Sequence, residues 1–506
     1  MPMNKKFNIP KEIVNITETL ENRGFEAYLV GGCVRDLIRK AVYGELVEPK
    51  DWDITTNATP EQIIELFPKT VYENKFGTVV VITETSAETL RQVEVTPYRI
   101  ETKYSDNRHP DAVKFSNHLE DDLKRRDFTA NAIAYNISKG QTVDLFDGLK
   151  DIKDKTIRAV GNPNERFQED ALRLIRAIRF SAQLGFAVSQ ETMEAIIRNA
   201  KLLKNISQER IRDEFSKIIM TSEPMSGIAM LEKTGLLDYL IPELKEGIKV
   251  EQKGEHIYDV WEHLLRALQH SADKGWPLQI RLSALFHDIG KPKTRRAVVG
   301  TKDNPLSQTK KAYTFYGHEV VGARMAQKIM ERLKFSKKIT DTVVKLIRYH
   351  MFFSDPSLIT LSAVRRLVKN VGPELVWDLM KVRICDRIGM GKPKEEPYRL
   401  RKYESMIEEA MRAPVSVGML KVDGNKIMEI TGEKAGPRLG FILHALLEEA
   451  LENPDINTEE YLNKRVKELS KMPDKDLKKL GEAGKEAKEE VEEQELKTIR
   501  KKYGVK

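Results

Sequence analysis

Residues 50–59 read KDWDITTNAT, and this stretch decides the fold of the amino-terminal part of the chain. Asp51 and Asp53 are two residues apart, so on a β-strand both carboxylates face the same side. Two carboxylates placed in this way can hold a hard divalent cation such as Mg²⁺, which takes oxygen ligands. A D-x-D pair alone is equally typical of a polar strand edge, and the flanking sequence must decide between the two interpretations.

Short segments rich in β-branched and aromatic residues surround this pair and predict a small sheet. They are EAYLV (26–30), DWDITT (51–56), TVVVITE (78–84), RQVEVT (91–96) and QTVDLFD (141–147). A helix is predicted to begin at Pro60, because Thr59 can cap it and Gln62 completes a capping box. From about Asn164 the apolar spacing becomes helical and stays so. We therefore predict an α+β fold in which a head with a small mixed sheet precedes all-helical domains.

The composition indicates a protein of several domains without a disulfide framework. At 506 residues the chain is too long for one core, and its two cysteines are far apart, which favours a reducing cytoplasm. The sequence has neither a long apolar run nor a signal-peptide pattern, so we expect a cytoplasmic protein with no membrane partner. The net charge of +8 fits a nucleic-acid partner, and it fits a lysine-rich solvated surface equally well.

Glycines and charged residues around the D-x-D pair suit a nucleoside triphosphate. Gly31 and Gly32 directly follow a predicted strand, where a backbone without β-carbons can approach a phosphate; an ordinary strand-to-helix turn would use the same residues. Arg35 lies in the helix that follows, and Glu94 offers a third strand carboxylate. The segment KRRDFTANAIAYN (124–136) adds Arg125, Arg126, Asp127 and Asn131.

Four motifs in order give the chain a resemblance to a known family. LVGGCVRD (29–36), DWDITT (51–56), RRDFTANAIA (125–134) and EDALRLIR (169–176) are similar to those of the class II tRNA nucleotidyltransferases, which include CCA-adding enzymes and bacterial poly(A) polymerases. The resemblance covers residues 25–240 and implies transfer of nucleotides to the 3′-hydroxyl of an RNA. It also implies that Asp51 and Asp53 hold Mg²⁺, with Glu94 as the third catalytic carboxylate.

The resemblance assigns base selection to the segment that begins at Glu169. Glu169, Asp170 and Arg173 match the family's E-D-x-x-R motif, and on one helix they would share a face; the same spacing is also that of an ordinary intrahelical ion pair. In the family the aspartate and arginine read the edge of the incoming base, so that C and A are accepted. The other residues assigned to nucleotide binding are Gly31, Gly32, Arg35, Arg126, Asp127, Asn131, Arg176 and Arg179.

The product is open between CCA, A alone and poly(A). The polar segment 98–127 contains SDNRHP (105–110), and in the family a flexible loop here switches the site from CTP to ATP. The arginine-rich signature of bacterial poly(A) polymerases is missing after residues 91–96. We therefore expect CCA addition from CTP and ATP, with an A-adding enzyme or poly(A) polymerase as the alternative. The intact motifs disfavour an inactive RNA-binding protein. We assign no role to the surface excursion at 41–49.

Six of the nine histidines fall between residues 256 and 350, at 256, 263, 270, 287, 318 and 350. The order of His263, His287, Asp288 and Asp386 resembles the HD superfamily of metal-dependent phosphohydrolases. The resemblance implies that these four residues hold a divalent transition metal such as Ni, Mn, Co or Fe, with His318 and His350 as further ligands or phosphate contacts. By analogy with other CCA enzymes that carry this domain, the substrates would be RNA phosphate ends such as 2′,3′-cyclic or 2′-phosphates. The alternative is a helical domain that only supports the RNA.

The segment GNKIMEITGEKAGPRLGFILHALLEEALENP (424–454) predicts two helices, with Pro437 at the start of the second. Free amides there, together with Lys434 and Arg438, could bind a phosphate, and a plain helical hairpin would look the same. In the family this region holds the tRNA elbow, so we expect both the 3′ end and the elbow of tRNA as partners. The Lys/Glu-rich end predicts a solvated helix or a disordered tail. The expected domains are a head (1–160), a neck (161–245), an HD domain (246–394), a tRNA-binding tail (395–472) and a charged extension (473–506).

Overall fold

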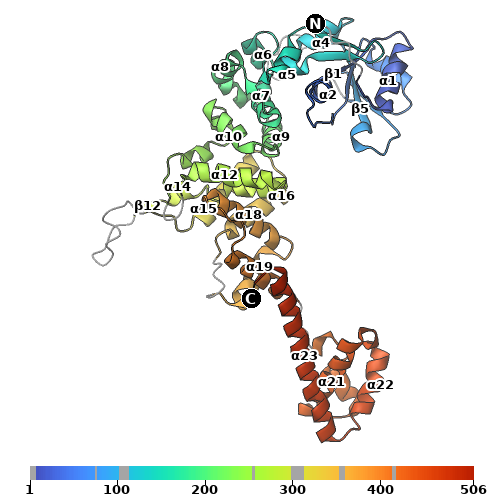
Figure 1. Cartoon of the computed structure of the whole chain (residues 1–506), viewed down its shortest axis with the longest axis vertical. Helices are drawn as coiled ribbons and strands as arrows, with labels where there is room; N and C mark the ends of the chain where they lie inside the picture. The colour runs from blue at the N-terminus through green and yellow to red at the C-terminus, as the bar shows by residue number, and fades with distance from the viewer. Residues whose placement is uncertain are drawn as a thin grey trace. The chain divides into compact units, whose positions relative to one another are not determined.

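The computed structural model describes residues 7–73, 77–101, 113–252, 257–297, 313–352, 359–412 and 417–505. The fold is α+β, as predicted, with the strands concentrated in the amino-terminal third (Figure 1). The chain divides into two compact units, of which the first holds residues 1–350 and 381–392 and the second holds 351–380 and 393–506. Within the described residues, no helix has both the length and the apolar character that crossing a membrane requires.

A seven-stranded mixed sheet forms the head, in the order β3-β4-β5-β2-β1-β8-β9. The strands are β1 Ala27–Val30, β2 Asp53–Thr56, β3 Thr70–Glu73, β4 Thr78–Ile82, β5 Gln92–Pro97, β8 Ile133–Asn136 and β9 Gln141–Asp144. Strand β1 runs antiparallel to β2, which runs parallel to β5. The end of β1 and the starts of β2 and β5 therefore meet at one edge of the sheet.

Helices cover the apolar face of this sheet. They include α1 (Lys11–Glu21), α2 (Gly32–Tyr43), α3 (Pro60–Leu66) and α5 (Gly148–Lys153). Ile54 and Val95 of neighbouring strands are fully buried in a core that also holds Leu29. The predicted capping box is confirmed, because the Thr59 hydroxyl accepts from the Gln62 amide and the Gln62 side chain accepts from the Thr59 amide.

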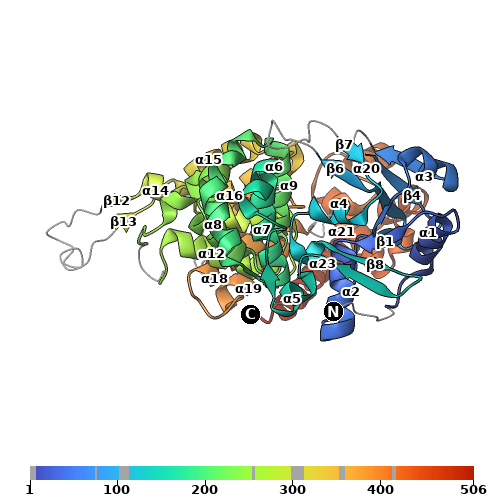
Figure 2. The same cartoon turned by 90° about the horizontal axis from the view of Figure 1, so that it is seen from above.

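Helices make up the rest of the first unit. They include α6 (Pro163–Glu169), α7 (Leu172–Leu184), α8 (Gln190–Asn199), α9 (Gln208–Ile219), α10 (Pro224–Lys233), α12 (Val260–Asp273), α13 (Leu278–Phe286), α15 (His318–Arg332), α16 (Lys337–Tyr349) and the carboxyl end of α18 (Val376–Gly389). One continuous apolar core extends from Phe128 through Phe215 to Ile347. Helix α7 lies beside the head in both Figure 1 and Figure 2.

The second unit is helical. Its helices include α17 (Leu361–Val371), α19 (Tyr398–Met411), α20 (Gly424–Thr431), α21 (Pro437–Glu452), α22 (Glu459–Leu469) and α23 (Asp474–Lys502). The prediction of two helices joined near Pro437 is confirmed by α20 and α21. The Lys/Glu-rich end is neither disordered nor fully solvated, because α23 buries Leu477, Gly481 and Gly484. The two glycines let its backbone approach α21, as a β-carbon on Gly484 would lie 2.3 Å from the His444 carbonyl oxygen.

Candidate functional site

Three carboxylates line one pocket at the edge of the head sheet. Asp53 begins β2 and is the register partner of Glu94 on β5, so these two side chains project from adjacent positions of the same face. Asp51 precedes the strand in a bend, and the prediction that both aspartates lie on the strand is wrong. The pairing of β2 with β1 ends at Asp53 and Val30, so β1 does not pair with the backbone that precedes Asp53. All three carboxylates line a pocket of about 450 Å³.

The glycine turn after β1 lies directly against Asp53. Gly31 has a φ of +82°, and a β-carbon there would lie 3.3 Å from both Asp53 Oδ2 and Arg126 Nη1. A residue other than glycine would therefore be strained and would crowd the carboxylate. Gly32 begins α2, which presents free amides beside the pocket. The turn, Asp53 and Arg126 thus form one cluster.

Electrostatics at Asp53 favour the binding of a cation. Burial raises the pKa of the Asp53 carboxyl above its ordinary value, and the carboxylates of Asp51 and Asp122 raise it further, against the guanidinium of Arg126. Asp122 is fully buried and binds Arg126 through Nη2 at 3.0 Å and Arg125 through Nε at 2.9 Å. Asp122 is absent from the residues predicted from the sequence, although its spacing of three and four residues from the arginines could have identified it.

Residues of the head and of α7 meet around Phe180. Asp127 accepts from Arg176 Nε at 2.9 Å and Nη2 at 2.6 Å; burial opposes ionisation of this carboxyl, but Arg176 lowers its pKa to about 2. The Phe180 ring lies under the guanidinium groups of Arg179 at 4.1 Å, Arg176 at 5.3 Å and Arg35 at 5.6 Å. The structure therefore brings these nucleotide-binding candidates together on one aromatic ring.

Arg35 is fixed from the head side of this cluster. Its side chain is buried, donates to both carboxylate oxygens of Asp36 at 2.9 Å, and donates to Asn131 Oδ1 at 2.7 Å. The Asn131 amide in turn lies 3.4 Å from Asp127 Oδ1. The predicted residues Arg35, Asn131 and Asp127 thus form a continuous chain of hydrogen bonds from α2 to α7.

The E-D-x-x-R segment does not lie on one helix. Helix α6 ends at Glu169, Asp170 has extended backbone, and α7 begins at Leu172, so the prediction of a shared helical face is wrong. Arg173 donates to Glu169 Oε2 at 2.5 Å and to the Arg125 carbonyl oxygen at 2.9 Å. Asp170 instead accepts from Arg210 Nη2 at 2.8 Å. Arg210 was not found from the sequence, because it lies 40 residues away on α9 and no motif links the two.

Four predicted metal ligands of the histidine-rich region meet in the interior. The ligand atoms of His263, His287, Asp288 and Asp386 all lie within 4.8 Å of one another, and all four residues are buried. His263 Nε2 lies 3.0 Å from Asp288 Oδ2, and His287 Nε2 lies 3.5 Å from Asp386 Oδ1. The three elements that meet here are α12, the end of α13, and α18.

A second group shares Asp288. Its other oxygen, Oδ1, lies 3.1 Å from His318 Nε2 and 3.5 Å from His350 Nε2. The candidate His256 lies outside the described residues, and His270 packs against Trp276 at 6.0 Å instead of joining either group. Asp288 therefore lies between two sets of imidazoles.

The donor chemistry of this cluster fits a divalent transition metal. Nδ1 of His287, His318 and His350 each faces a backbone carbonyl oxygen at 2.7–2.8 Å, so it carries the proton and turns Nε2 towards the other cluster residues. Nε2 of His287 lies 2.9 Å from Nε2 of His263. Within the described residues, the buried Nε2 atoms of His318 and His350 make no hydrogen bond, although both lie near Asp288 Oδ1. Burial disfavours the protonation of His287, but Asp288 and Asp386 raise its pKa to about 10. Burial instead lowers the pKa of His263 and of His350, so a positive charge is favoured at His287 and not throughout the cluster.

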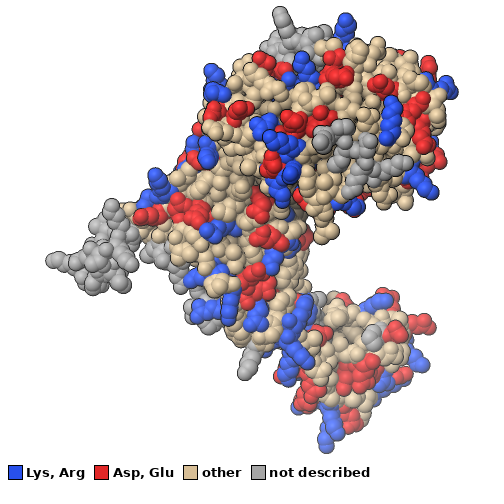
Figure 3. All heavy atoms as spheres, turned by 45° about the horizontal axis from the view of Figure 1, so that its top comes forward, with Lys and Arg blue, Asp and Glu red and all other residues tan. Residues whose placement is uncertain are grey.

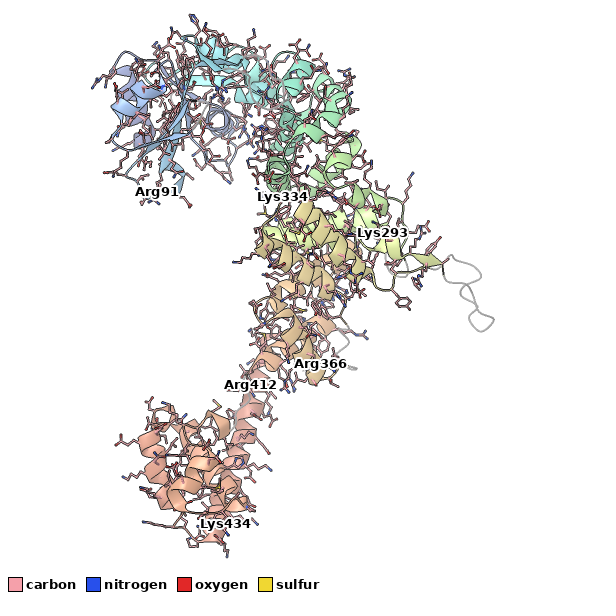
Figure 4. The ribbon with its side chains drawn as sticks, turned by 180° about the vertical axis from the view of Figure 1, so that it is seen from behind. Arg91, Lys293, Lys334, Arg366, Arg412 and Lys434 are labelled. Carbon is pink, nitrogen blue, oxygen red and sulfur yellow. The ribbon has the colours of Figure 1, made fainter. Side chains whose placement is uncertain are left out.

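The two predicted tRNA-binding residues differ in their surroundings. Lys434 is exposed on the connection between α20 and α21 (Figure 4). Arg438 binds its own unit, because it donates to Glu433 Oε1 at 2.9 Å and to the carbonyl oxygens of Ser470 and Met472 at 2.8 Å. Lys/Arg and Asp/Glu side chains are interspersed over the face shown in Figure 3, so no single basic patch stands out on it.

The core of the predicted nucleotide-switching loop, residues 102–112, lies outside the described residues. The strands that flank it, β6 (Arg99–Glu101) and β7 (Val113–Phe115), pair in antiparallel orientation. The loop is therefore joined to the head at the two ends of a short strand pair, and the prediction about its role stays a prediction.

Comparisons with known proteins agree with this arrangement. Family models match for the Poly A polymerase head domain (27–158), the probable RNA and SrmB-binding site of polymerase A (185–248) and the HD domain (255–399). The chain is 41% identical over 273 residues to a CCA-adding enzyme of Enterococcus faecalis and 44% identical over 242 residues to one of Lactococcus lactis. These matches cover 54% and 47% of this chain, and 62% and 58% of the relatives, so the chain spans little more than half of their length.

A solved structure extends the similarity over most of the chain. The Bacillus stearothermophilus CCA-adding enzyme in complex with CTP is 28% identical, with a TM-score of 0.58, over 90% of this chain and 96% of that one. The three family matches follow one another along the chain. The first three of the four motifs, within residues 29–134, lie inside the head-domain match, whereas the segment 169–176 lies between the first and second matches. These comparisons therefore support the resemblance of the chain to the class II tRNA nucleotidyltransferases, and residues 255–399 match an HD domain.

Proposed function

We propose that the chain adds C, C and A, from CTP and ATP, to the 3′ end of tRNA without a nucleic-acid template. One observation carries this proposal: Asp51, Asp53 and Glu94 line a single pocket beside the Gly31 turn and Arg126. Further support comes from the relatives, which are CCA-adding enzymes and one of which binds CTP. The same relatives favour CCA addition over an A-adding enzyme or a poly(A) polymerase.

Each group in the pocket has a separate task in this proposal. Asp51, Asp53 and Glu94 would hold Mg²⁺, whose bound ions supply charge stabilisation to the attacking and leaving oxygens. The Gly31 turn admits the phosphates, and Arg126 and Arg176 balance their charge. Asp170 offers acceptors and Arg173 offers donors to the base edge. Transfer of a nucleotidyl group depends mainly on positioning and charge neutralisation, which these residues provide.

The test offers labelled CTP or ATP separately to tRNAs that end before CCA, after C and after CC. We expect CTP to be incorporated on the first two substrates and ATP on the third. Asp53→Asn should reduce both reactions to background. Incorporation of ATP alone would replace the proposal with an A-adding enzyme, and no incorporation on any substrate would contradict it.

We also propose that the histidine cluster makes the HD domain a metal-dependent phosphohydrolase acting on RNA phosphate ends, such as 2′,3′-cyclic or 2′-phosphates. The cluster residues would hold a divalent transition metal such as Ni, Mn, Co or Fe, which when bound supplies a Lewis acid for phosphate-ester hydrolysis. Because Asp288 offers one oxygen to each group of imidazoles, the donor set could hold two ions. Lys291 fixes this carboxylate, with its Nζ 2.5 Å from Asp288 Oδ2 and 2.6 Å from Gln252 Oε1.

Paired variants separate the two proposed activities. Asp288→Ala should lose phosphatase activity and bound metal, measured by elemental analysis of the purified protein, while it keeps CCA addition. Asp53→Asn should show the reverse pattern. Phosphatase activity and metal content unchanged in Asp288→Ala would contradict the second proposal and leave the first intact.

A further inference from the structure

We propose that the side of the catalytic pocket formed by Lys50, Thr89 and Gln92 binds the 3′-terminal nucleotide of the RNA acceptor. This inference rests on the proposed transferase function and assigns the two substrates to opposite sides of Asp53. The acceptor is recognised through its last phosphodiester and its ribose hydroxyls, groups that every RNA end shares.

The order of the strands gives Asp53 two distinct sides. Strand β2 lies between β1 and β5, so the Gly31 turn at the end of β1 and Glu94 on β5 flank Asp53 from opposite directions. On the β1 side lie the arginines, with Arg126 against Gly31. On the β5 side the pocket continues over Val80, the register partner of Glu94 on β4.

The chemistry of the reaction assigns a substrate to each side. The triphosphate carries the larger negative charge and belongs with the arginines beside the Gly31 turn. In a phosphoryl-type transfer the attacking and leaving oxygens lie roughly in line on either side of the phosphorus atom. With the pyrophosphate leaving towards the arginines, the attacking 3′-hydroxyl must approach from the β5 side, where Glu94 and Gln92 line the pocket.

The residues on that side suit an RNA end. Among the described residues that line the pocket, Lys50 is the only cation, whereas Asp51, Asp53, Glu88 and Glu94 are carboxylates. Lys50 is exposed and has no hydrogen bond or ion pair within the described part of the chain, so its amine is available to a phosphodiester. Its charge would attract the last phosphodiester of the acceptor beside the carboxylates that would hold Mg²⁺.

Two neutral polar side chains complete the acceptor side. Thr89, in the short helix Glu88–Leu90, and Gln92, at the start of β5, are both exposed at the pocket. A hydroxyl and an amide can each donate and accept, as a ribose 2′-hydroxyl does. Arg91, between them in the chain, does not line the pocket and lies at the outer edge of the head (Figure 4).

Steady-state kinetics of Lys50→Ala test the inference. We expect the KM for a tRNA that ends before CCA to rise about tenfold, while the KM for CTP and for ATP stays within twofold, because a single phosphate contact is lost. The slope of the logarithm of the RNA-binding constant against the logarithm of the salt concentration should become shallower by about one unit. Lys50→Arg should retain most of the affinity for RNA.

Lys139→Ala is the matched control. Lys139 is an exposed lysine in the β8–β9 turn, at the opposite end of the strands, so its loss removes the same charge without touching the pocket. A raised KM for CTP with an unchanged KM for RNA would overturn the inference, as would equal RNA affinity in Lys50→Ala and Lys139→Ala. Failure of the transferase proposal itself is distinguishable, because the unmodified protein would then incorporate no nucleotide.

Discussion

Asp170 owes its orientation to an arginine from a different helix. Its carboxylate caps the start of α7 by accepting from the Leu172 amide at 3.0 Å, and it accepts from Arg210 of α9 at 2.8 Å. Arg173 is held separately, by Glu169 and by a backbone carbonyl oxygen. The two groups proposed to read the base are therefore fixed independently, and each can be perturbed without the other.

Replacement of Arg210 by methionine should loosen Asp170 while leaving the catalytic carboxylates in place. We expect the KM for CTP and ATP to rise roughly tenfold or more, because a hydrogen bond to a charged group contributes about 1.5–3 kcal/mol. Misincorporation of GTP and UTP should increase. The control is Arg212→Met on the same helix, whose partner Asp213 is exposed. Equal kinetics and fidelity in the two variants would contradict a positioning role for Arg210.

Glu404 gives the second unit a dependence on pH. The side chain lies in α19 and is 7% exposed; burial, reinforced by Glu396 and opposed by Arg401, raises its pKa from 4.5 to about 7. Between these values the folded protein keeps a proton that the unfolded chain has lost. The stability contributed by this proton is therefore present below pH 4.5 and is lost as the pH rises to about 7.

Denaturant unfolding at pH 5 and pH 8 measures this contribution. Between pH 5 and pH 8 the unmodified protein should lose up to about 3 kcal/mol of its free energy of unfolding, as one pKa unit corresponds to about 1.4 kcal/mol. Glu404→Gln should abolish this loss. Glu409→Gln, on the same helix and half-buried, serves as the control. If the unmodified protein and Glu404→Gln respond equally to pH, the assignment to Glu404 is wrong.

At the scale of elements, the contact between α2 and α7 joins the head to the segment proposed to read the base. Phe180 mediates this contact, because Arg35 of α2 and Arg176 and Arg179 of α7 lie over its ring. The three guanidinium groups repel one another, and the ring together with nearby carboxylates offsets that repulsion. The aromatic ring thus sets the spacing of charges that the triphosphate would meet.

Loss of the ring in Phe180→Leu should therefore impair nucleotide binding more than stability. We expect the KM for CTP and ATP to rise about tenfold, with Phe180→Tyr retaining most of the activity because the ring remains. Phe186→Leu is the control, since Phe186 is also buried and carries Arg39 over its ring at 5.6 Å, outside the site. Equal kinetic losses in the two leucine variants at similar thermal stability would refute the role of Phe180.

The packing of α23 on α21 makes a prediction for stability. Gly484→Ala should lower the free energy of unfolding by about 1–3 kcal/mol, because the added β-carbon would meet the backbone of His444. A β-carbon on Gly440 in α21 would meet open space. Gly440→Ala should therefore raise the free energy of unfolding by up to about 1 kcal/mol, because alanine has the higher helix propensity. Denaturation of the two variants checks the difference; a neutral Gly484→Ala would show that the helices do not pack so closely.

The elements also show where prediction from sequence succeeds and fails. The β-branched run of β4 and the capped start of α3 were predictable, because local preference and structure agree there. Strand β8 was missed, since its residues IAYN continue a charged motif without turn residues in between. The break at Asp170 was missed because the helical spacing of apolar residues continues across it. Contacts over a long separation, such as Asp170–Arg210, leave no local signal.

At the scale of the whole molecule, two chemically different sites occupy the first compact unit. The head offers carboxylate oxygens beside arginines, whereas the histidine cluster offers imidazoles around Asp288. These donor sets select different cations, so the two proposed activities need not share a metal. The residue types of both sites were predictable from motifs. The pairing of Asp53 with Glu94 and the position of Asp288 between two groups of imidazoles could be seen only in the folded structure.

The sequence of the nucleotides that the protein adds tests the central claim most directly. A tRNA that lacks its last three nucleotides is incubated with the protein and all four nucleoside triphosphates, and the 3′ ends of the products are sequenced. The account predicts C, C and A in that order, followed by termination, with G and U absent. A run of A residues, random addition or unchanged 3′ ends would contradict it.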